Sequence, residues 1–360
     1  MAAAKTVTLT TFIPEGLPGP EHFTIVESAA PTEADLAEGG VLLQVLVMSA
    51  DPYLRSKCKD EEKAGQALPM TMTGFVAGKV LASKRPDYVA GDLFGASLPF
   101  TTVQAVDAAA AKSTLMWKLS ALLTEETISH GIGVLGMPGS TAYGGLLDVL
   151  RPDAGAAAAG TPETLWVSGS AGAVGGMVAQ IAKNVLGCKV IGSCGGPEKV
   201  ALCVEKLGLD GAVDYKKCGS REELSAALKE LAPDGVDMYF DNVGGIHFEA
   251  AMAALRPHGR VAICGGISRY NEASGAAGEL RVPERFFPTD MIYSFQRVEG
   301  FMCLPWLSGQ KGHFLKDMSG WLKEGKVKAE ETFFEGIDAW PMAFQALFTG
   351  GNKGKVVVRI

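Results

Sequence analysis

The sequence predicts an α/β protein built on a Rossmann-type doubly wound parallel sheet, with a second domain of short strands. Three observations carry this prediction. From Leu165 onward, apolar strand-like runs alternate with segments of helical periodicity. A glycine-containing turn, Ser170 to Gly175, stands between the first such strand and the first such helix. Before about Gly139, the chain instead reads as short strands bounded by Gly and Pro.

In the alternating part, five expected strands are joined by four expected helices, which is the pattern of right-handed crossovers between parallel strands. Ser220 to Glu223 is a capping-box pattern that opens one of its helices. The Ala/Gly-rich stretch 153–160 is interpreted as a surface loop. The expected strands are 165–167, 189–192, 212–215, 236–240 and 260–264, and the expected helices are 141–149, 174–185, 198–207, 220–231 and 247–255.

The first part of the chain, with strands expected at 41–47, 76–81 and 92–95, predicts a small β barrel or sandwich. The tail from about Lys328 returns to strand-like and loop patterns, and we expect its last strand, 355–360, to rejoin this first domain. The expected division is therefore a domain of short strands over residues 1–139, a domain of alternating strands and helices over 140–303, and a return to the first domain over 304–360.

Composition places the chain among ordinary globular proteins, with 47% hydrophobic and 20% charged residues in a length of 360. The formal net charge of −7 disfavours nucleic acid or an anionic membrane as the main partner. No apolar run approaches the length needed to span a bilayer, and the amino terminus lacks a secretory pattern. The seven cysteines include no C-x-x-C pair and indicate buried, reduced thiols, so we expect a cytoplasmic location.

The turn at Ser170, Gly172 and Gly175 matches the dinucleotide fingerprint G-x-G-x-x-G with serine in the first position. Its second glycine would let backbone approach a pyrophosphate, and its third would let the helix pack closely on the strand. The amino end of that helix would supply free N–H groups and partial positive charge. The alternative is a plain turn between a strand and a helix that uses glycine only for its geometry.

The end of the second strand predicts NADP(H) rather than NAD(H). No acid stands at that strand end to accept hydrogen bonds from an adenosine ribose, and Lys199 follows closely. A 2′-phosphate would be favoured by Lys199, by small Ser193 and by nearby N–H groups. The alternative reading of Lys199 is an exposed lysine at a helix start, and Glu198 beside it is a mild counter-signal.

No metal site is expected. A zinc dehydrogenase needs Cys, His and carboxylate ligands for catalysis and a four-cysteine lobe for structure. None of the five histidines stands beside a Cys or an acid at ligand spacing, and residues 71–76 carry no ligand where one would be expected. Alcohol dehydrogenation assisted by zinc is therefore poorly supported.

Five motifs and the tail together carry a family resemblance. They are 50–55 (ADPYLR), 136–143 (GMPGSTAY), 171–175 (AGAVG), 239–245 (YFDNVGG), 264–271 (CGGISRYN) and 350–355 (GGNKGK). These motifs resemble those of the zinc-independent medium-chain dehydrogenases/reductases, occur in that family's order and cover nearly the whole chain. Within that group the match is to the branch of prostaglandin reductase, leukotriene B4 12-hydroxydehydrogenase and plant NADP-dependent alkenal double-bond reductases.

The resemblance implies a GroES-like β-barrel catalytic domain and NADPH-dependent reduction of the C=C bond of α,β-unsaturated ketones or aldehydes, of the 2-alkenal or 15-oxoprostaglandin type. Hydride would add to the β-carbon, and negative charge would develop on the carbonyl oxygen. Tyr270 matches the tyrosine that stabilises this enolate in the family, although it could instead only line the cofactor loop. Tyr53 matches a position facing the substrate, where it would either orient the carbonyl or form a pocket wall.

The remaining implied contacts are to the cofactor. Asn242 would touch it after the fourth strand, unless its side chain closes an Asx turn there. The family also implies a homodimer. Pro305 and the loop 271–288 depart from the family pattern, and aromatic Phe286, Phe287 and Tyr293 could line a substrate pocket, a dimer edge or the core. The implied cofactor contacts are Gly172, Ala173, Val174, Gly175, Lys199, Tyr215, Asn242, Cys264, Gly265, Gly266, Ile267, Ser268, Tyr270, Phe301, Met302, Cys303 and Asn352.

Two alternatives to the enone reductase stay open at this point. One is an NADPH quinone oxidoreductase on the same fold, which would use the same site for a flat ring. The other is a non-catalytic protein that binds NADPH for structural or regulatory reasons. Retention of Tyr270 argues against the second, since binding alone does not require that phenol.

Overall fold

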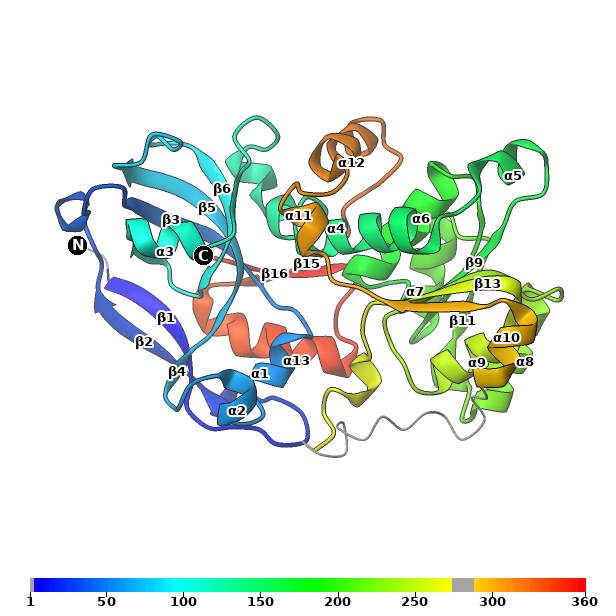
Figure 1. Ribbon diagram of the computed structural model, residues 1–360. Helices are drawn as coiled ribbons and strands as arrows, with labels where there is room; N and C mark the ends of the chain where they lie inside the picture. Colours follow the sequence, from blue (N-terminus) through cyan, green and yellow to red (C-terminus); the bar gives the residue numbers. More distant parts are fainter. Residues whose placement is uncertain (1–2, 274–287) are drawn as a thin grey trace. The chain divides into compact units, whose positions relative to one another are not determined.

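The computed structural model describes residues 3–273 and 288–360, which form two compact units (Figure 1). Unit 1 comprises the described residues of Met1–Met137, Tyr270–Ser274 and Glu331–Ile360. Unit 2 comprises the described residues of Pro138–Arg269 and Gly275–Glu330. The return to the first unit thus begins at Glu331, close to Lys328, where the sequence pattern changes, and not at residue 304, where the domain boundary was expected.

The physical reason for that difference is the packing of α11 (Leu304–Leu307) and α12 (Phe314–Lys323) within unit 2. The Tyr143 hydroxyl donates a 2.7 Å hydrogen bond to Asp317 on α12, and the Trp306 indole N–H on α11 donates to Asp148. Tyr143 and Asp148 both lie on the helical segment that begins unit 2. These two helices are therefore part of the parallel-sheet unit.

Unit 2 holds a parallel sheet whose described strands run in the order β11-β10-β9-β12-β13-β14. Counted along the chain, this is the order 3-2-1-4-5-6 of a dinucleotide-binding sheet, so the predicted doubly wound α/β class is confirmed. Its strands are β9 (Thr164–Ser168), β10 (Lys189–Cys194), β11 (Gly211–Asp214), β12 (Val236–Asp241), β13 (Leu255–Ile263) and β14 (Arg297–Gly300).

Helices follow the strands as expected, and Ser220 caps α8 by accepting a hydrogen bond from Glu223 N. Buried α8 and α9 side chains pack on one face of the sheet against Trp166 and Tyr239. The stretch expected as a loop at 153–160 contains a short helix instead, since Asp153 caps it and alanine favours helix. The helices are α4 (Met137–Gly144), α5 (Ala154–Ala158), α6 (Ala173–Asn184), α7 (Pro197–Ala201), α8 (Arg221–Leu231), α9 (Ile246–Ala254) and α10 (Pro288–Ser294), with π-helical turns at Gly145–Leu150 and Leu202–Lys206 and 3₁₀ turns at Tyr215–Lys217 and Ile267–Arg269.

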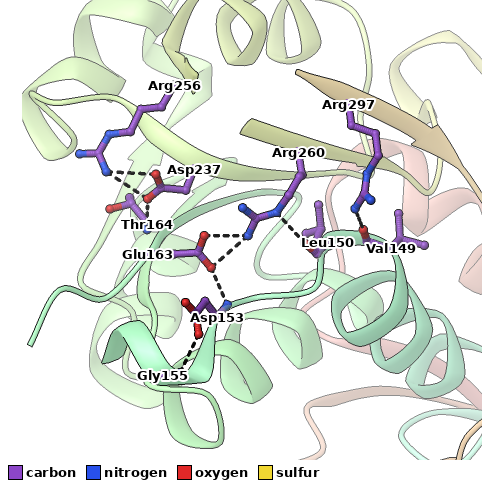
Figure 2. Close-up of polar contacts among 10 residues, drawn as sticks. All are labelled: Val149, Leu150, Asp153, Gly155, Glu163, Thr164, Asp237, Arg256, Arg260 and Arg297. Atoms are coloured by element: carbon purple, nitrogen blue, oxygen red, sulfur yellow. Dashed lines mark hydrogen bonds and ion pairs between the residues drawn. The ribbon is translucent and has the colours of Figure 1, made fainter. Parts of the chain in front are cut away.

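Arginines tie the sheet of unit 2 to the segment that leads into it (Figure 2). The Arg260 guanidinium donates to both oxygens of Glu163, at 2.9 and 3.0 Å, and its Nε donates to Leu150 O at 2.7 Å. Arg297 donates to Val149 O. These bonds satisfy carbonyls at the carboxyl end of the π-helical turn, which would otherwise lack partners.

Unit 1 is built on mostly antiparallel sheet, with one parallel pair between β15 and β16, which agrees with the predicted domain of short strands. In its described residues, one sheet runs β2-β1-β4 and the other β15-β16-β3-β5-β6-β8, with β7 also paired to β3. The last strand of the chain, β16, pairs with β3, so residues 355–360 rejoin the first domain as the sequence predicted. The strands are β1 (Ala3–Leu9), β2 (Phe23–Ala29), β3 (Val41–Ser49), β4 (Met70–Thr71), β5 (Thr73–Ser83), β6 (Leu93–Pro99), β7 (Val103–Val106), β8 (Met116–Lys118), β15 (Glu331–Glu335) and β16 (Lys355–Arg359).

The core of unit 1 includes a helix that the sequence pattern did not indicate. Trp340 and Phe344 on α13 are fully buried and stack with ring centroids 5.1 Å apart. Because this helix is apolar on most of its faces, its periodicity is weak and the segment resembled strand and loop. The helices of the unit are α1 (Leu54–Lys57), α2 (Glu61–Ala64), α3 (Ala108–Ser113) and α13 (Trp340–Thr349), with 3₁₀ turns at Pro20–His22, Glu33–Asp35, Glu125–Ile132 and Ile337–Ala339.

Candidate functional site

The expected cofactor residues of unit 2 follow the carboxyl ends of its parallel strands. Because those ends meet along one edge of a parallel sheet, residues far apart in sequence come together there. This edge is the ordinary ligand-binding edge of a doubly wound sheet. Gly172 to Gly175 follow β9, Lys199 follows β10, Tyr215 follows β11, Asn242 follows β12, Cys264 to Ser268 follow β13, and Phe301 to Cys303 follow β14.

The turn after β9 has the close packing that its glycines predict. Gly172 precedes α6 as its N-cap, and Gly172 N donates to Gly169 O at 2.9 Å. A Cβ added at Gly175 would lie 2.4 Å from Gly169 O, so a side chain has no room there. Gly172, Ala173 and Val174 are half-buried at the amino end of the 12-residue helix α6, where N–H groups lack intrahelical partners.

Ser170, which replaces the first glycine of the fingerprint, is fully buried and makes contacts within the fold. Its Oγ donates to Ser193 O at 3.2 Å and lies 3.3 Å from the Cys203 Sγ. Gly192 makes room for it, because a Cβ at Gly192 would lie 2.4 Å from the Ser170 Oγ. Serine is therefore accommodated by the neighbouring strand, and the turn keeps its geometry.

Two lysines, rather than one, flank the end of β10. Lys199 lies half-buried on α7. A Cβ added at Gly195 would lie 2.9 Å from the Lys216 Cε and 3.1 Å from the Tyr215 hydroxyl, which places both side chains beside this glycine. Burial raises the pKa of the Tyr215 phenol, so it stays a neutral hydrogen-bond donor. Lys216 was not predicted from the sequence, although its place directly after β11 indicated it.

Asp214 is an acid close to the end of β10, supplied by the neighbouring strand. Its Oδ1 accepts hydrogen bonds from Gly196 N at 2.7 Å and from Lys216 N at 3.2 Å. The carboxylate thus shapes the loop that carries Lys199. The strand end itself is free of acid, as the sequence analysis noted.

Asp241, at the end of β12, organises the loops beside it. Its Oδ1 accepts hydrogen bonds from the Tyr239 hydroxyl at 2.7 Å, from Gly244 N at 2.8 Å and from Val243 N at 3.0 Å. Burial raises the pKa of this carboxyl, and the bonds from Gly244, Tyr239 and Val243 oppose that shift. Asp241 was not predicted as a site residue from the sequence, whereas its neighbour Asn242 was.

Asn242 and the loop after β13 are held by this same arrangement. Asn242 Nδ2 donates to Ser168 O at 2.7 Å, so its side chain joins the ends of β9 and β12 and does not close an Asx turn. Cys264 N and Gly265 N both donate to Asp241 O, at 2.9 and 3.1 Å. Ile267 N donates to Asn242 O and Ser268 N to Val243 O, at 3.3 and 3.2 Å, which fastens one loop to the other.

The segment after β14 completes the edge. The Phe301 ring packs edge-on against Phe240, with centroids 5.9 Å apart, and a Cβ at Gly145 would lie 2.3 Å from it. Met302 is 70% exposed, and Cys303 is half-buried at the start of α11. Met302 is therefore a large apolar side chain presented beside the sheet edge.

Three expected site residues belong to unit 1. Tyr53 precedes α1 and meets Phe75 edge-on, with ring centroids 6.4 Å apart. Tyr270 is half-buried in the short segment Tyr270–Ser274. Asn352 Nδ2 donates to Gly354 O at 3.1 Å in the turn before β16. Phe286 and Phe287 lie outside the described residues.

Tyr293 is 83% exposed, so core packing is the wrong reading for it. Neighbouring Ile292 and Phe295 are also exposed, at 66% and 68%. The three form an apolar surface at α10, next to the outer strand β14.

Comparison with known proteins now identifies the family. Residues 173–302 match the family model described as zinc-binding dehydrogenase, and residues 5–114 match the N-terminal domain of oxidoreductase. The chain is 37% identical over 360 residues to prostaglandin reductase 1 of Mus musculus, covering 100% of both chains. It belongs to the medium-chain dehydrogenase/reductase family of oxidoreductases. Its relatives place it in the zinc-independent, prostaglandin reductase branch, so the predicted family is confirmed.

Other members of this family resemble the chain over nearly its whole length. It is 34% identical over 349 residues to the NADPH-dependent curcumin reductase of Escherichia coli (strain K12), covering 96% of this chain and 94% of that one. The crystal structure of CurA in complex with NADPH from Vibrio vulnificus is 31% identical, with a TM-score of 0.83, and the match covers 99% of this chain and 98% of that one. The fold of this branch is therefore present throughout the chain.

The zinc in the name of one family model does not fit the donors seen in this oxidoreductase. Over residues 3–273 and 288–360, no group of three or more His, Cys, Asp and Glu side chains could hold a metal ion. The seven cysteines, all within that part, are free thiols. No helix in the same residues is long and apolar enough to cross a membrane.

Proposed function

We propose that this oxidoreductase reduces the C=C double bond of α,β-unsaturated ketones and aldehydes with NADPH, in the manner of a 2-alkenal or 15-oxoprostaglandin reductase. The observation that carries the proposal is the full-length similarity to prostaglandin reductase 1 and to the NADPH-dependent curcumin reductase. The dinucleotide turn after β9 and the ligand-binding edge of the parallel sheet in unit 2 also support it. NADPH, when bound, supplies the hydride that adds to the β-carbon of the substrate.

Tyr270 is proposed to stabilise the product of that addition. As hydride reaches the β-carbon, the electron pair of the double bond moves toward the carbonyl, and charge develops on its oxygen. A neutral phenol near that oxygen donates a hydrogen bond that strengthens as the charge grows, and so lowers the barrier. The α-carbon then takes a proton to give the saturated product. Tyr53 is proposed to orient the carbonyl or to form a wall of the pocket.

The preference for NADPH is proposed to rest on Lys199, Lys216 and the Tyr215 hydroxyl. Lysine binds phosphate as a point charge, and a phenol adds a directed hydrogen bond. The remaining cofactor contacts proposed from the family, including Asn242, Cys264 to Ser268, Phe301 to Cys303 and Asn352, stay predictions.

The phosphate assignment has a direct test. Lys199→Ala and Lys216→Ala should each weaken NADPH by a larger factor than NADH, because only NADPH carries the 2′-phosphate. Fluorescence titration with both dinucleotides measures this, and Lys229→Ala on the same unit is the control. Equal losses for the two dinucleotides would contradict the assignment.

Substrate class is tested by mixing the protein and NADPH with enals, simple enones, a 15-keto-prostaglandin and quinones, and following NADPH oxidation. Turnover of enones and enals, with a saturated product by mass spectrometry, supports the proposal. Turnover of quinones alone would replace it with the quinone oxidoreductase alternative. Tight NADPH binding with no turnover of any compound would favour the non-catalytic alternative.

A homodimer is proposed from the outer strand of the parallel sheet. In the described residues β14 pairs on one side only, and exposed Ile292, Tyr293 and Phe295 lie next to it. An open strand edge with apolar neighbours favours pairing with the same edge of a second copy about a two-fold axis. Light scattering should give twice the chain mass, and Tyr293→Asp should shift it toward the monomer. A monomeric wild type at micromolar concentration would rule this out.

We also propose a cytoplasmic location. Seven free thiols are typical of a reducing compartment. Fractionation of the source cells would test it.

A further inference from the structure

Arg55 is a fully buried arginine in unit 1, two residues after Tyr53. Its Nε donates to Asn271 Oδ1 at 3.0 Å, and its Nη2 donates to Gly16 O at 3.1 Å. Gly16 N in turn donates to Asn271 O at 2.8 Å. Arg55, Asn271 and Gly16 therefore form a closed ring of three hydrogen bonds, which we call the Arg55 ring.

The Arg55 ring holds Asn271 by both its side chain and its backbone. Asn271 directly follows Tyr270, so its fixed carbonyl and amide side chain limit the directions in which the Tyr270 backbone can move. Lys59 adds a further contact, because its Nζ donates to Glu272 O at 2.6 Å. Lys59 is 6% exposed, so both cations that hold this segment are buried.

The other side of the Arg55 ring is the short helix that follows Tyr53. Leu54 N donates to Asp51 O at 3.1 Å and Ser56 N to Tyr53 O at 3.2 Å, so Tyr53 and Arg55 share one tight turn. Ile13 N donates to Cys58 O at 2.7 Å, which fastens the loop carrying Gly16 to the same turn. The backbones of Tyr53 and Tyr270, 217 positions apart by subtraction of their numbers, are thereby joined through one guanidinium.

Burying a guanidinium is costly, and burial lowers the pKa of Arg55. A cation in such a place needs directed hydrogen bonds to be tolerated. The N–H donors of a planar guanidinium lie in a rigid fork, whereas the three donors of an ammonium rotate. This buried cation holds a short segment, residues 270–273, which begins with Tyr270 and ends where the described range ends. A neutral side chain would fill the same space at a lower desolvation cost.

We infer that Arg55 is a positioning residue for Tyr270, and that it sets the phenol's orientation relative to Tyr53 during reduction. The inference rests on the proposed function for its kinetic consequence. Arg55 itself need not touch the substrate, since it acts through Asn271. A misplacement of a reacting or stabilising group by about 1 Å can lower a rate by roughly 100-fold, so even a small loss of order has a measurable effect.

The kinetic test is a double-mutant cycle. Arg55→Met should lower kcat for enone reduction by roughly 10- to 100-fold while NADPH binding changes by less than about twofold. In a Tyr270→Phe background the same substitution should lower kcat by less than about twofold further, because the group it positions is already gone. Arg359→Met, at an exposed ion pair with Glu335, is the matched control and should leave kcat unchanged.

Two further variants keep the test decisive if Arg55→Met folds poorly. Arg55→Lys should recover part of the lost kcat, since an ammonium can serve one of the two acceptors. Asn271→Ala should reproduce the loss without removing the cation. Independent, multiplicative losses in the Tyr270→Phe background, or an unchanged kcat in both Arg55→Lys and Asn271→Ala, would overturn the inference.

Hydrogen exchange separates the failure of this inference from failure of the proposed function. If the wild type reduces no enone, the proposed function fails, and the Arg55 ring is then judged by exchange alone. Arg55→Lys and Asn271→Ala should speed amide exchange at Gly16 and across residues 268–273, with exchange in β12 unchanged. Unchanged exchange at Gly16 in both variants would show that the ring does not hold the segment.

Discussion

The Nζ of Lys355 donates a 2.7 Å hydrogen bond to the Asp51 carboxylate, and both residues are buried, at 2% and 3% exposure. The same ammonium donates to Ser49 Oγ at 2.6 Å and to Ala50 O at 2.9 Å, which uses all three of its protons. The first residue of β16 therefore fixes the residues that lead to Tyr53.

Lys355→Met should lower the free energy of unfolding by about 3–5 kcal/mol, because it leaves the Asp51 carboxylate buried without its partner. Chemical denaturation measures this. Lys5→Met is the matched control, since Lys5 pairs with Glu27 and Asp338 at the surface and should cost less than about 1 kcal/mol. Similar losses for both variants would mean that the buried pair contributes no more than an exposed one.

Gly175, the last residue of the dinucleotide turn, and Gly176, the next residue of α6, should respond in opposite directions to alanine. At Gly175 the new Cβ would lie 2.4 Å from the backbone oxygen of Gly169, which cannot give way easily. At Gly176 the nearest atoms lie 3.4 and 3.5 Å away, an ordinary contact. Gly175→Ala should therefore destabilise unit 2 by about 1–3 kcal/mol and weaken NADPH at least tenfold.

Gly176→Ala should instead be neutral or stabilise by up to about 1 kcal/mol, since alanine favours the interior of α6 more than glycine does. Thermal unfolding and NADPH titration of the two variants test the pair together. Equal tolerance at both positions would show that the turn relaxes around Gly175.

Local rules predicted the strand–turn–helix units of unit 2, because strand and helix periodicities and the capping box at Ser220 act over a few residues. They failed at α13, where Trp340 and Phe344 are buried in a helix that is apolar on most of its faces. They failed also at α5, where an Ala/Gly run resembled a loop.

Whether a site residue could be predicted from the sequence also depended on whether its role is local. Gly172 and Gly175 could be recognised because their function depends on a local turn. Asp241 was missed because part of its significance comes from Ser168 and from the loop after β13, which come beside it only in the fold. The bond between Arg55 and Asn271, whose partners are 216 positions apart, leaves no pattern along the chain at all.

His247 should make stability depend on pH. Its ring is buried, stacked on Trp166 at 6.1 Å and edge-on to Tyr215 at 5.2 Å, and burial lowers its pKa from 6.5 to about 4. Below about pH 6.5 the unfolded chain therefore takes up a proton that the folded chain excludes until about pH 4. The stabilising contribution of the neutral ring is complete above about pH 6.5 and is lost as pH falls toward about 4.

His247→Phe keeps an aromatic ring and removes the titrating group. Between about pH 7 and pH 4.5, the wild type should lose roughly 2–3 kcal/mol more unfolding free energy than this variant. Urea titrations at both pH values measure the difference, and the carboxylates common to both proteins cancel in it. The control is His313→Gln, at an exposed histidine. It should lose the same unfolding free energy as the wild type over this pH range. If the gap between His247→Phe and the wild type stays constant with pH, the ring titrates alike in the folded and unfolded chains.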